Sequence, residues 1–237
     1  MSRELRAHDQ RIGAMFDRIS PRYDHLNRVL SFGADLAWRR RATALARLDP
    51  GARALDVGAG TGDLAFAILG ASEAGARVTA VDLSPAMLGL FAARAARLGV
   101  AARADAVVGS AQRLPFPDAA FERVVAGFAV RNFGDLGAGL AELRRVLRPG
   151  GRAVLLELST PPNAAVRALY RLYFHHLAPL VAIALGGDAR AYRYLPTSVA
   201  RFPGAEAFAD LLRGAGFRAV RFERLTFGIA AIHVGEV

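Results

Sequence analysis

A glycine-rich turn between a predicted strand and a predicted helix constrains this chain more than any other feature. The apolar run Arg53 to Val57 ends in Gly58-Ala59-Gly60-Thr61-Gly62, and a helix-forming segment follows from Asp63 to Leu69. Glycines at alternate positions let a backbone turn tightly and touch a ligand closely. The free N–H groups of the helix start favour an anionic group there. The sequence therefore predicts a strand–turn–helix unit that binds a ligand.

The rest of the chain alternates between strand-like and helix-like patterns. Further strands are predicted over Ala76 to Val81, Ala104 to Val108, Phe121 to Ala126 and Arg152 to Leu158. Helices are predicted from Ser84-Pro85 to about Leu98, from Asp135 through Leu147 and Arg148 to the break at Pro149-Gly150-Gly151, and over Ala205 to Ala215. This alternation is typical of a doubly wound α/β fold with a parallel sheet. Two last strands, Arg218 to Leu225 and Ile229 to Val234, predict an antiparallel hairpin at the sheet edge.

Two segments stand outside this alternation. Residues 1–48 are helix-forming and predict an N-terminal helical cap. Residues 160–202 are rich in aromatic side chains and mostly helix-like, which predicts a helical insertion or lid beside a substrate. The chain length fits one α/β domain with an insertion, so a single domain over residues 1–237 is expected.

Composition and charge exclude several classes of function. The chain has no cysteine, so disulfides, thiolate zinc sites and cysteine nucleophiles are excluded. No apolar run approaches the roughly 18 to 20 residues that span a bilayer, and the charged N-terminus does not look like a secretory signal, so a cytoplasmic protein is expected. The formal charge of +10 comes from arginine, of which only Arg39-Arg40-Arg41 forms a tight run. Solvated faces or contact with an anionic membrane explain this charge better than a nucleic-acid stripe.

Two acidic residues indicate which ligand the turn binds. Asp82 ends the second strand, where a carboxylate can accept both ribose hydroxyls of a cofactor. A dinucleotide fingerprint would carry its third glycine where this chain has Asp63. A carboxylate there disfavours a pyrophosphate and suits the ammonium group of an amino acid. The pattern therefore favours S-adenosylmethionine over a nicotinamide dinucleotide.

Short motifs along the chain narrow this class further. They are Phe16-Asp17, Tyr23-Asp24-His25-Leu26-Asn27, Ser31-Phe32-Gly33, Trp38-Arg39, Asp82-Leu83-Ser84, Leu114-Pro115-Phe116, Arg131-Asn132, Arg148-Pro149-Gly150-Gly151, Glu157-Leu158-Ser159, Tyr192-Arg193-Tyr194-Leu195, Phe202-Pro203 and Gly228-Ile229-Ala230-Ala231-Ile232-His233. In these motifs the chain resembles the menaquinone/ubiquinone biosynthesis C-methyltransferase family (UbiE/MenG type). The resemblance implies a class I S-adenosylmethionine-dependent methyltransferase with a Rossmann-like, mostly parallel sheet, a C-terminal antiparallel hairpin and no metal.

The resemblance also implies which residues hold the cofactor. They are Gly58, Gly60, Thr61, Asp82, Ser110, Ala111 and Gly127. Ser110 and Ala111 would lie beside the adenine, and Gly127 would line the methionine end. The family usually has Asp or Asn in place of Ser110 and an acidic residue near Gln112. Adenine contacts are therefore expected to be weaker here, or to come from the backbone.

The implied methyl acceptor is a polyprenyl quinol such as demethylmenaquinol. Arg131 would stabilise a phenolate, Asn132 would orient the ring, and Tyr23, one helical turn from Asn27, would face the cofactor. A guanidinium stays protonated and is a poor base, so the proton acceptor is left open. The candidates are a water held by Arg131, the carboxylate of Asp17, and His233.

Several residues have a plainer interpretation. Trp38 fits packing, and Tyr170, Tyr173 and Phe174 recur at helical spacing that fits either a core or an aromatic lid. His175-His176 would point to different helix faces, so no metal site is predicted.

The alternative substrate class is another lipid or polyketide phenol. An enzyme that methylates nucleic-acid amino groups would carry Asn/Asp-Pro-Pro-aromatic where this chain reads Gly127-Phe128-Ala129-Val130, so no nucleic-acid partner is expected. Transient contact with the inner membrane face is expected, and a homodimer is left open.

Overall fold

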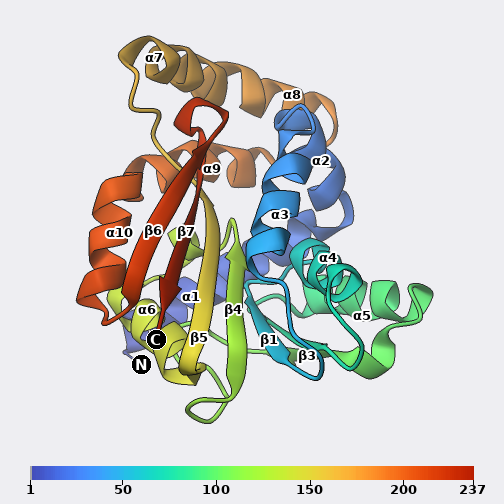
Figure 1. Ribbon diagram of the computed structural model, residues 1–237. Coiled ribbons are helices and arrows are strands. Elements are labelled where there is room, and N and C mark those ends of the chain that lie inside the picture. The colour runs from blue at the N-terminus through green and yellow to red at the C-terminus, as the bar shows by residue number, and fades with distance from the viewer. Residues whose placement is uncertain (1) are drawn as a thin grey trace.

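The computed structural model describes residues 2–237, and at residues 189, 190, 192 and 193 it describes the backbone only. Within that range, one seven-stranded sheet has the strand order β3-β2-β1-β4-β5-β7-β6 (Figure 1). The strands are β1 (Arg53–Val57), β2 (Arg77–Asp82), β3 (Ala104–Val108), β4 (Phe121–Gly127), β5 (Leu147–Leu158), β6 (Arg218–Leu225) and β7 (Ala230–Glu236). Strands β1 to β5 pair in parallel, and β7 is antiparallel to both β5 and β6. The predicted fold class is therefore confirmed, including the C-terminal hairpin.

Helices cover both faces of this sheet. Apart from short 3-10 turns, the described helices are α1 (Arg3–Ile19), α2 (Tyr23–Leu30), α3 (Ala34–Leu45), α4 (Asp63–Ala71), α5 (Pro85–Arg97), α6 (Leu136–Val146), α7 (Ala164–Leu172), the π-helix η4 (Tyr173–Leu177), α8 (Ala178–Ala184), α9 (Ala189–Arg201) and α10 (Ala205–Gly214). One buried cluster joins α3, α4 and α5 to one face, and another joins α6 and α10 to the other. Neighbouring residues of β4 divide between these clusters, since Val124 faces one and Val125 the other. The inner strands are thus largely buried on both faces, as parallel strands usually are, whereas the edge strands β3 and β6 are half-buried or exposed.

The boundary between α6 and β5 differs from the prediction. The sequence assigns Leu147 and Arg148 to the helix, but α6 ends at Val146 and β5 begins at Leu147. Leu147 pairs with Phe121 of β4, and the register shifts before Arg123 pairs with Arg152. Pairing with a buried strand outweighs the helical spacing of the leucines. Pro149-Gly150-Gly151 therefore lies inside β5 and does not mark the helix end.

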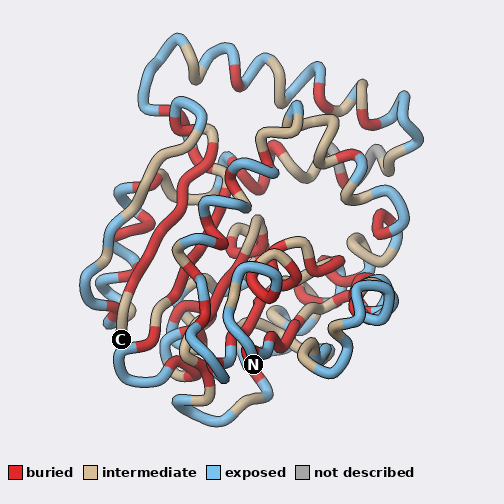
Figure 2. The backbone as a smooth tube through the Cα atoms, turned by 45° about the vertical axis from the view of Figure 1, so that its right-hand side comes forward, coloured by how far each residue is buried: buried red, intermediate tan, exposed pale blue. Residues whose placement is uncertain are grey.

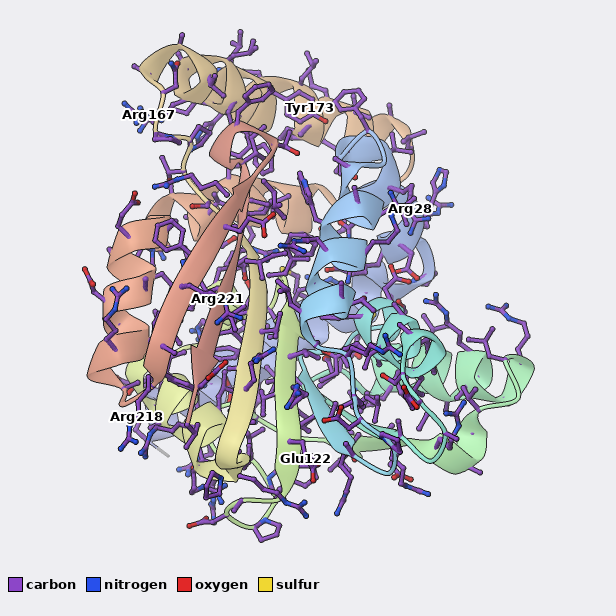
Figure 3. The ribbon with its side chains drawn as sticks, in the orientation of Figure 1. Arg28, Glu122, Arg167, Tyr173, Arg218 and Arg221 are labelled. Carbon is purple, nitrogen blue, oxygen red and sulfur yellow. The ribbon has the colours of Figure 1, made fainter. Side chains whose placement is uncertain are left out.

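A layer of helices lies over the carboxyl ends of the parallel strands, and it is formed by both segments that fall outside the alternation (Figure 1). The hydroxyl of Tyr173 in η4 donates to the carbonyl of Leu30 in α2 at 2.9 Å (Figure 3). Arg22 donates to the carbonyl of Gly186 at 2.7 Å, and Leu26 of α2 packs on Ala182 of α8. The outward face of α7 and α8 is largely exposed (Figure 2). Among the described residues, no helix is long and apolar enough to cross a membrane. Met1 and the side chains of the Tyr192-Arg193 motif lie outside the described residues.

Candidate active site

Two adjoining cavities lie at the carboxyl edge of the sheet. The first is lined by the glycine turn and by the ends of β2, β3 and β4. The second is larger and is lined mainly by apolar side chains of α2, α3, α7, η4 and the β6–β7 turn. Tyr23, Arg39 and Phe128 line both cavities. Groups held in the two cavities would therefore approach each other beside these three residues.

The glycine turn shapes the floor of the first cavity. Gly60 has φ +56°, and a Cβ added there would meet no atom within 4 Å, so this backbone is open to a ligand. Gly62 has φ +86°, and a Cβ there would lie 2.5 Å from the rings of Phe66 and Phe91. One glycine thus leaves room for a ligand, while the other allows the turn to pack on the core.

Asp82 at the end of β2 is held in place by the backbone. Its Oδ2 accepts from the N–H of Gly60 at 2.8 Å, and its Oδ1 accepts from the N–H of Ser84 at 2.9 Å. Burial raises the pKa of Asp82, and these backbone hydrogen bonds oppose that shift. A carboxylate has about four acceptor positions, so lone pairs remain for the two hydroxyls of a ribose. The residues present fit a nucleoside cofactor.

Two carboxylates and one hydroxyl lie at the other side of the glycine turn, and they belong to Asp63, Asp24 and Thr61. Asp63 forms an ion pair with Arg94 at 2.6 Å, and Arg28 and Arg39 each lie 3.7 Å away. Burial alone would raise the pKa of Asp63, but these guanidinium groups outweigh it and hold the pKa low. Asp63 is thus already matched by cations. Asp24 instead accepts from the hydroxyl of Thr61 at 2.8 Å and faces the same cavity, so it suits an ammonium group better.

The predicted cofactor residues all line the first cavity. They are Gly58, Gly60, Thr61, Asp82, Ser110, Ala111 and Gly127. Asp9 and Gln112 lie beside Ser110 in the same wall. Asp9 comes from α1, about one hundred residues away in sequence, and nothing in the local pattern singled it out.

Arg131 lines the second cavity and is not a free cation. Its side chain is 7% exposed, and its Nη1 pairs at 2.8 Å with Oε1 of Glu157, which is 1% exposed. The same nitrogen donates to the carbonyl of Phe128. Burial by itself would lower the pKa of Arg131, but Glu157 and the nearby tyrosines raise it, so the guanidinium stays charged. Its Nε is buried without a hydrogen-bond partner among the described residues.

Tyr23 and Tyr170 both line the second cavity. Burial raises the pKa of Tyr23, against the lowering effect of Arg131, and Tyr23 shares a side-chain hydrogen bond with Asn27. Burial also raises the pKa of Tyr170. The hydroxyl of Tyr170 is buried and lacks a hydrogen-bond partner within the described part of the chain. Both tyrosines are therefore protonated at neutral pH and can donate a hydrogen bond.

Phe128 and Arg39 form the boundary between the cavities, and the sequence did not indicate them. Phe128 has φ +62°, which is strained for a residue with a side chain. The Arg39 guanidinium lies 5.2 Å from the centre of its ring, and the Trp38 ring is 6.1 Å away. Strained backbone of this kind clusters at functional sites. The motif Trp38-Arg39 was a usable signal, but only its aromatic member was considered.

Comparison with known proteins identifies the family. The profile of the ubiE/COQ5 methyltransferase family matches residues 4–236. The chain belongs to this family. It is 49% identical over 225 residues to a demethylmenaquinone methyltransferase of Thermus thermophilus, covering 94% of this chain and 99% of the relative. It is 42% identical to a ubiquinone/menaquinone biosynthesis C-methyltransferase of Geobacter sulfurreducens, with 96% of this chain and 88% of the relative covered. The chain is thus an S-adenosylmethionine-dependent methyltransferase.

Solved structures agree with the fold. The [4+2]-cyclase SpnF superposes with a TM-score of 0.70 at 22% identity, covering 96% of this chain and 95% of the cyclase. An S-adenosylmethionine-dependent methyltransferase of Aquifex aeolicus gives a TM-score of 0.61 at 16% identity, with 84% and 89% of the two chains covered. At such identities these likenesses show the fold alone.

In this methyltransferase the two residues of the Arg131-Asn132 motif face different cavities. Asn132 lines the first cavity, whereas Arg131 lines the second, apolar cavity. The Oδ1 of Asn132 accepts from the hydroxyl of Tyr194 at 3.2 Å, and its carbonyl oxygen lies 3.0 Å from Nε2 of His8. Asn132 therefore holds α9 and α1 near the first cavity.

Two of the candidate bases lie outside both cavities. Asp17 accepts from the hydroxyl of Ser84 at 2.5 Å and from the N–H of Ala86 at 3.1 Å, at the start of α5. His233 is buried in β7, where its Nε2 lies 2.8 Å from the carbonyl oxygen of Ala205, and burial lowers its pKa to about 4. Neither residue lines the apolar cavity.

The histidine pair and the aromatic cluster have separate outcomes. Among the described residues, no three His, Asp or Glu side chains form a group that could hold a metal ion. Tyr170, Tyr173 and Phe174 line the apolar cavity together with Trp38. The rings of Tyr170 and Phe174 are 4.5 Å apart, so the aromatic segment packs on itself and presents one side to the cavity.

Proposed function

We propose that this methyltransferase transfers a methyl group from S-adenosylmethionine to a ring carbon of a polyprenyl quinol, such as demethylmenaquinol. The names of the curated relatives support this substrate class. The observation that carries the proposal is the apolar cavity, whose largely apolar lining includes the polar residues Tyr23 and Arg131. Such a cavity suits an apolar ligand that carries an oxygen atom.

The first cavity would hold the cofactor through the predicted residues. Asp82 would accept from the ribose hydroxyls, Gly58 and Gly60 would let the ligand approach the backbone, and Thr61 would fix Asp24 toward the ammonium group. Ser110 and Ala111 would lie at the adenine and Gly127 at the methionine end. When bound, S-adenosylmethionine supplies an electrophilic sulfonium methyl group. The cavities meet at Phe128, so this residue would separate donor from acceptor.

The chemistry requires a reduced ring with an oxyanion. A quinone ring is electron-poor, whereas a quinol that loses one hydroxyl proton gains negative charge on its ortho carbon. A phenolic pKa is about 10, so hydrogen-bond donors at the oxygen lower the barrier. Arg131 and Tyr23 would donate to that oxygen. Because Glu157 neutralises Arg131, the stabilisation would come from directed N–H groups more than from net charge. A water held by Arg131 is the proton acceptor that this geometry favours.

A short-chain demethylmenaquinol and simple phenols, assayed under reducing conditions, test this substrate class. We expect C-methylation of the quinol, detected by mass spectrometry, and little turnover of phenols. Preference for another lipid or polyketide phenol would replace the proposal. Four expectations from the sequence stay predictions: a single domain, residues 1–48 as a cap with 160–202 as a lid, the cytoplasmic location and the absence of a nucleic-acid partner. A homodimer is left open.

We infer that the apolar cavity opens onto a membrane surface. Phe32 and Phe227 line this cavity and are 83% and 79% exposed, and Leu169 lines it while 68% exposed. Leu180 on α8 is 65% exposed, and α7 also carries Arg167 and Arg171, one helical turn apart. Exposed apolar side chains with cations on the same helix suit an anionic lipid surface, from which an insoluble quinol could enter the cavity.

Co-sedimentation with vesicles tests this surface. Binding should rise with anionic lipid and fall with salt. Leu169→Glu combined with Leu180→Glu should weaken it, whereas Leu98→Glu, at an exposed leucine that follows α5, should not. Equal binding of all three proteins would contradict the proposed surface.

A further inference from the structure

We infer that Asp9 of α1 recognises the amino group of the cofactor's adenine and so selects adenosyl over other purine cofactors. The inference concerns the cofactor cavity and does not depend on the methyl acceptor. Asp9 lines that cavity beside Ser110, Ala111 and Gln112, and it is 7% exposed. A buried carboxylate is costly unless it is matched by donors, so its placement at a ligand cavity needs an explanation.

Two side chains of the loop after β3 orient this carboxylate. The hydroxyl of Ser110 donates to Oδ2 of Asp9 at 2.6 Å, and Nε2 of Gln112 donates to Oδ1 at 2.9 Å. The Oε1 of Gln112 accepts from the N–H of Asp135 at 2.6 Å, which fixes which way its amide points. The two polar residues of the loop, Ser110 and Gln112, therefore both donate hydrogen bonds to the carboxylate of Asp9 on α1.

The carboxylate of Asp9 supplies the acidic group that the loop after β3 lacks beside the expected adenine position. The loop itself carries no acidic side chain between Gly109 and Arg113. Adenine presents a donor, its exocyclic amine, next to an acceptor, so a wall that reads it needs an acceptor at the amine. Each carboxylate oxygen of Asp9 keeps one acceptor position after its bond to the loop. Ile12, Leu83 and Phe133 supply apolar lining to the same cavity, which suits the faces of a planar base.

The contact predicts discrimination against a purine with a carbonyl in place of the amine. Such a base would set a lone pair against the carboxylate and lose a charge-assisted hydrogen bond. A bond of that kind is worth about 10- to 100-fold in affinity. Wild-type protein should therefore bind S-adenosylhomocysteine about 10- to 100-fold more tightly than S-inosylhomocysteine.

Calorimetry with both ligands on wild type and Asp9→Asn tests the inference. An amide offers either an acceptor or a donor, so the preference should fall below about threefold in the variant, mainly through weaker binding of the adenosyl ligand. Asp17→Asn is the matched control, because Asp17 also ties α1 to a loop but lies outside the cavity. Its preference should equal that of wild type.

The other outcomes overturn the inference. If Asp9→Asn weakens both ligands equally, Asp9 only holds α1 in place. If wild type binds both ligands equally, no variant is needed to reject the contact. If Asp9→Asn does not fold, Ser110→Ala decides, because it keeps Asp9 and should keep the preference, whereas a lost preference would assign recognition to the serine. Failure of wild type to bind S-adenosylhomocysteine would also reject the cofactor itself, independently of the substrate.

Discussion

The cofactor cavity and the apolar cavity are built from different kinds of atoms. Backbone groups and carboxylates at strand ends shape the first, and most of its wall comes from short loops after β1, β2, β3 and β4. Side chains of helices far apart in the sequence shape the second, with α2 and α3 from the N-terminal segment and α7 and η4 from residues 164–177 (Figure 1). In the proposed function the sheet edge would hold the cofactor, while the helical layer would determine what the methyl group can reach.

This division predicts that changes in one cavity leave the other working. Turnover should depend on the residues of the apolar cavity, on one side of Phe128. Cofactor affinity should depend on the residues of the cofactor cavity, on its other side. Only residues that line both cavities, such as Tyr23 and Arg39, should couple the two properties.

The largest expected effect is on turnover and involves Arg131. Its removal alone would leave Glu157 buried and unpaired, which costs about 3 to 5 kcal/mol of stability. The double variant Arg131→Gln with Glu157→Gln avoids that unpaired charge. We expect kcat with a soluble quinol to fall about 10²- to 10³-fold, the usual cost of losing an oxyanion donor. Affinity for S-adenosylhomocysteine should stay close to that of wild type.

Glu157→Gln alone is the control for this variant. It keeps the guanidinium donors of Arg131, so its kcat should fall less than that of the double variant. Wild-type turnover in the double variant would remove Arg131 from the mechanism. An equal loss of cofactor affinity would show that the two cavities do not act separately.

The next effect is on cofactor affinity and involves Asp82. Asp82→Ala removes a carboxylate that would accept from the ribose, and such hydrogen bonds are worth about 1.5 to 3 kcal/mol. Calorimetry should show affinity for S-adenosylhomocysteine reduced about 10- to 100-fold. KM for the quinol at saturating cofactor should hardly change. Unchanged cofactor affinity in a folded variant would contradict the assignment.

The same contrast explains what the sequence could predict. The glycine turn, Asp82 and the ends of β1 to β4 follow from local pattern, because parallel strands bring their carboxyl ends to one edge. The assignment of Leu147 to the preceding helix was wrong, because strand pairing with Phe121 outweighs helical spacing. The Arg131–Glu157 pair, the position of Phe128 and the approach of Asp9 to Ser110 depend on contacts between residues far apart in sequence. No local pattern contains that information.

A third test concerns the charge beneath the glycine turn. Asp56 of β1 is fully buried, its Oδ2 accepts from the N–H of Ala65 at 3.1 Å, and burial raises its pKa to about 7. The folded protein therefore holds this proton more tightly than the unfolded chain, whose value is near 3.8. This contribution to stability is full below pH 3.8 and is lost as pH rises toward 7, by at most about 1.4 kcal/mol per pH unit.

Urea unfolding of wild type and Asp56→Asn between pH 4 and 8 measures this contribution. The variant cannot titrate at this position, so its stability relative to wild type should improve as the pH rises to 7 and then level off. Parallel pH profiles for the two proteins would mean that Asp56 is ionised in the folded state throughout. That result would place an unpaired charge beneath the cofactor cavity.

The smallest expected effect involves the wall of the apolar cavity. Nε1 of Trp38 in α3 donates to Oγ1 of Thr226 in the β6–β7 turn at 2.8 Å. Both residues line the apolar cavity, and neither lines the cofactor cavity. Trp38→Phe keeps an aromatic ring but loses this hydrogen bond, which is worth about 1 kcal/mol. Unfolding free energy should fall by about that amount, and KM for the quinol should rise by up to about fivefold. Thr226→Ser keeps the acceptor and should behave as wild type. Because Trp38 also packs on Phe128, a matching loss of cofactor affinity in Trp38→Phe would mean that Phe128 transmits changes between the cavities and does not separate them.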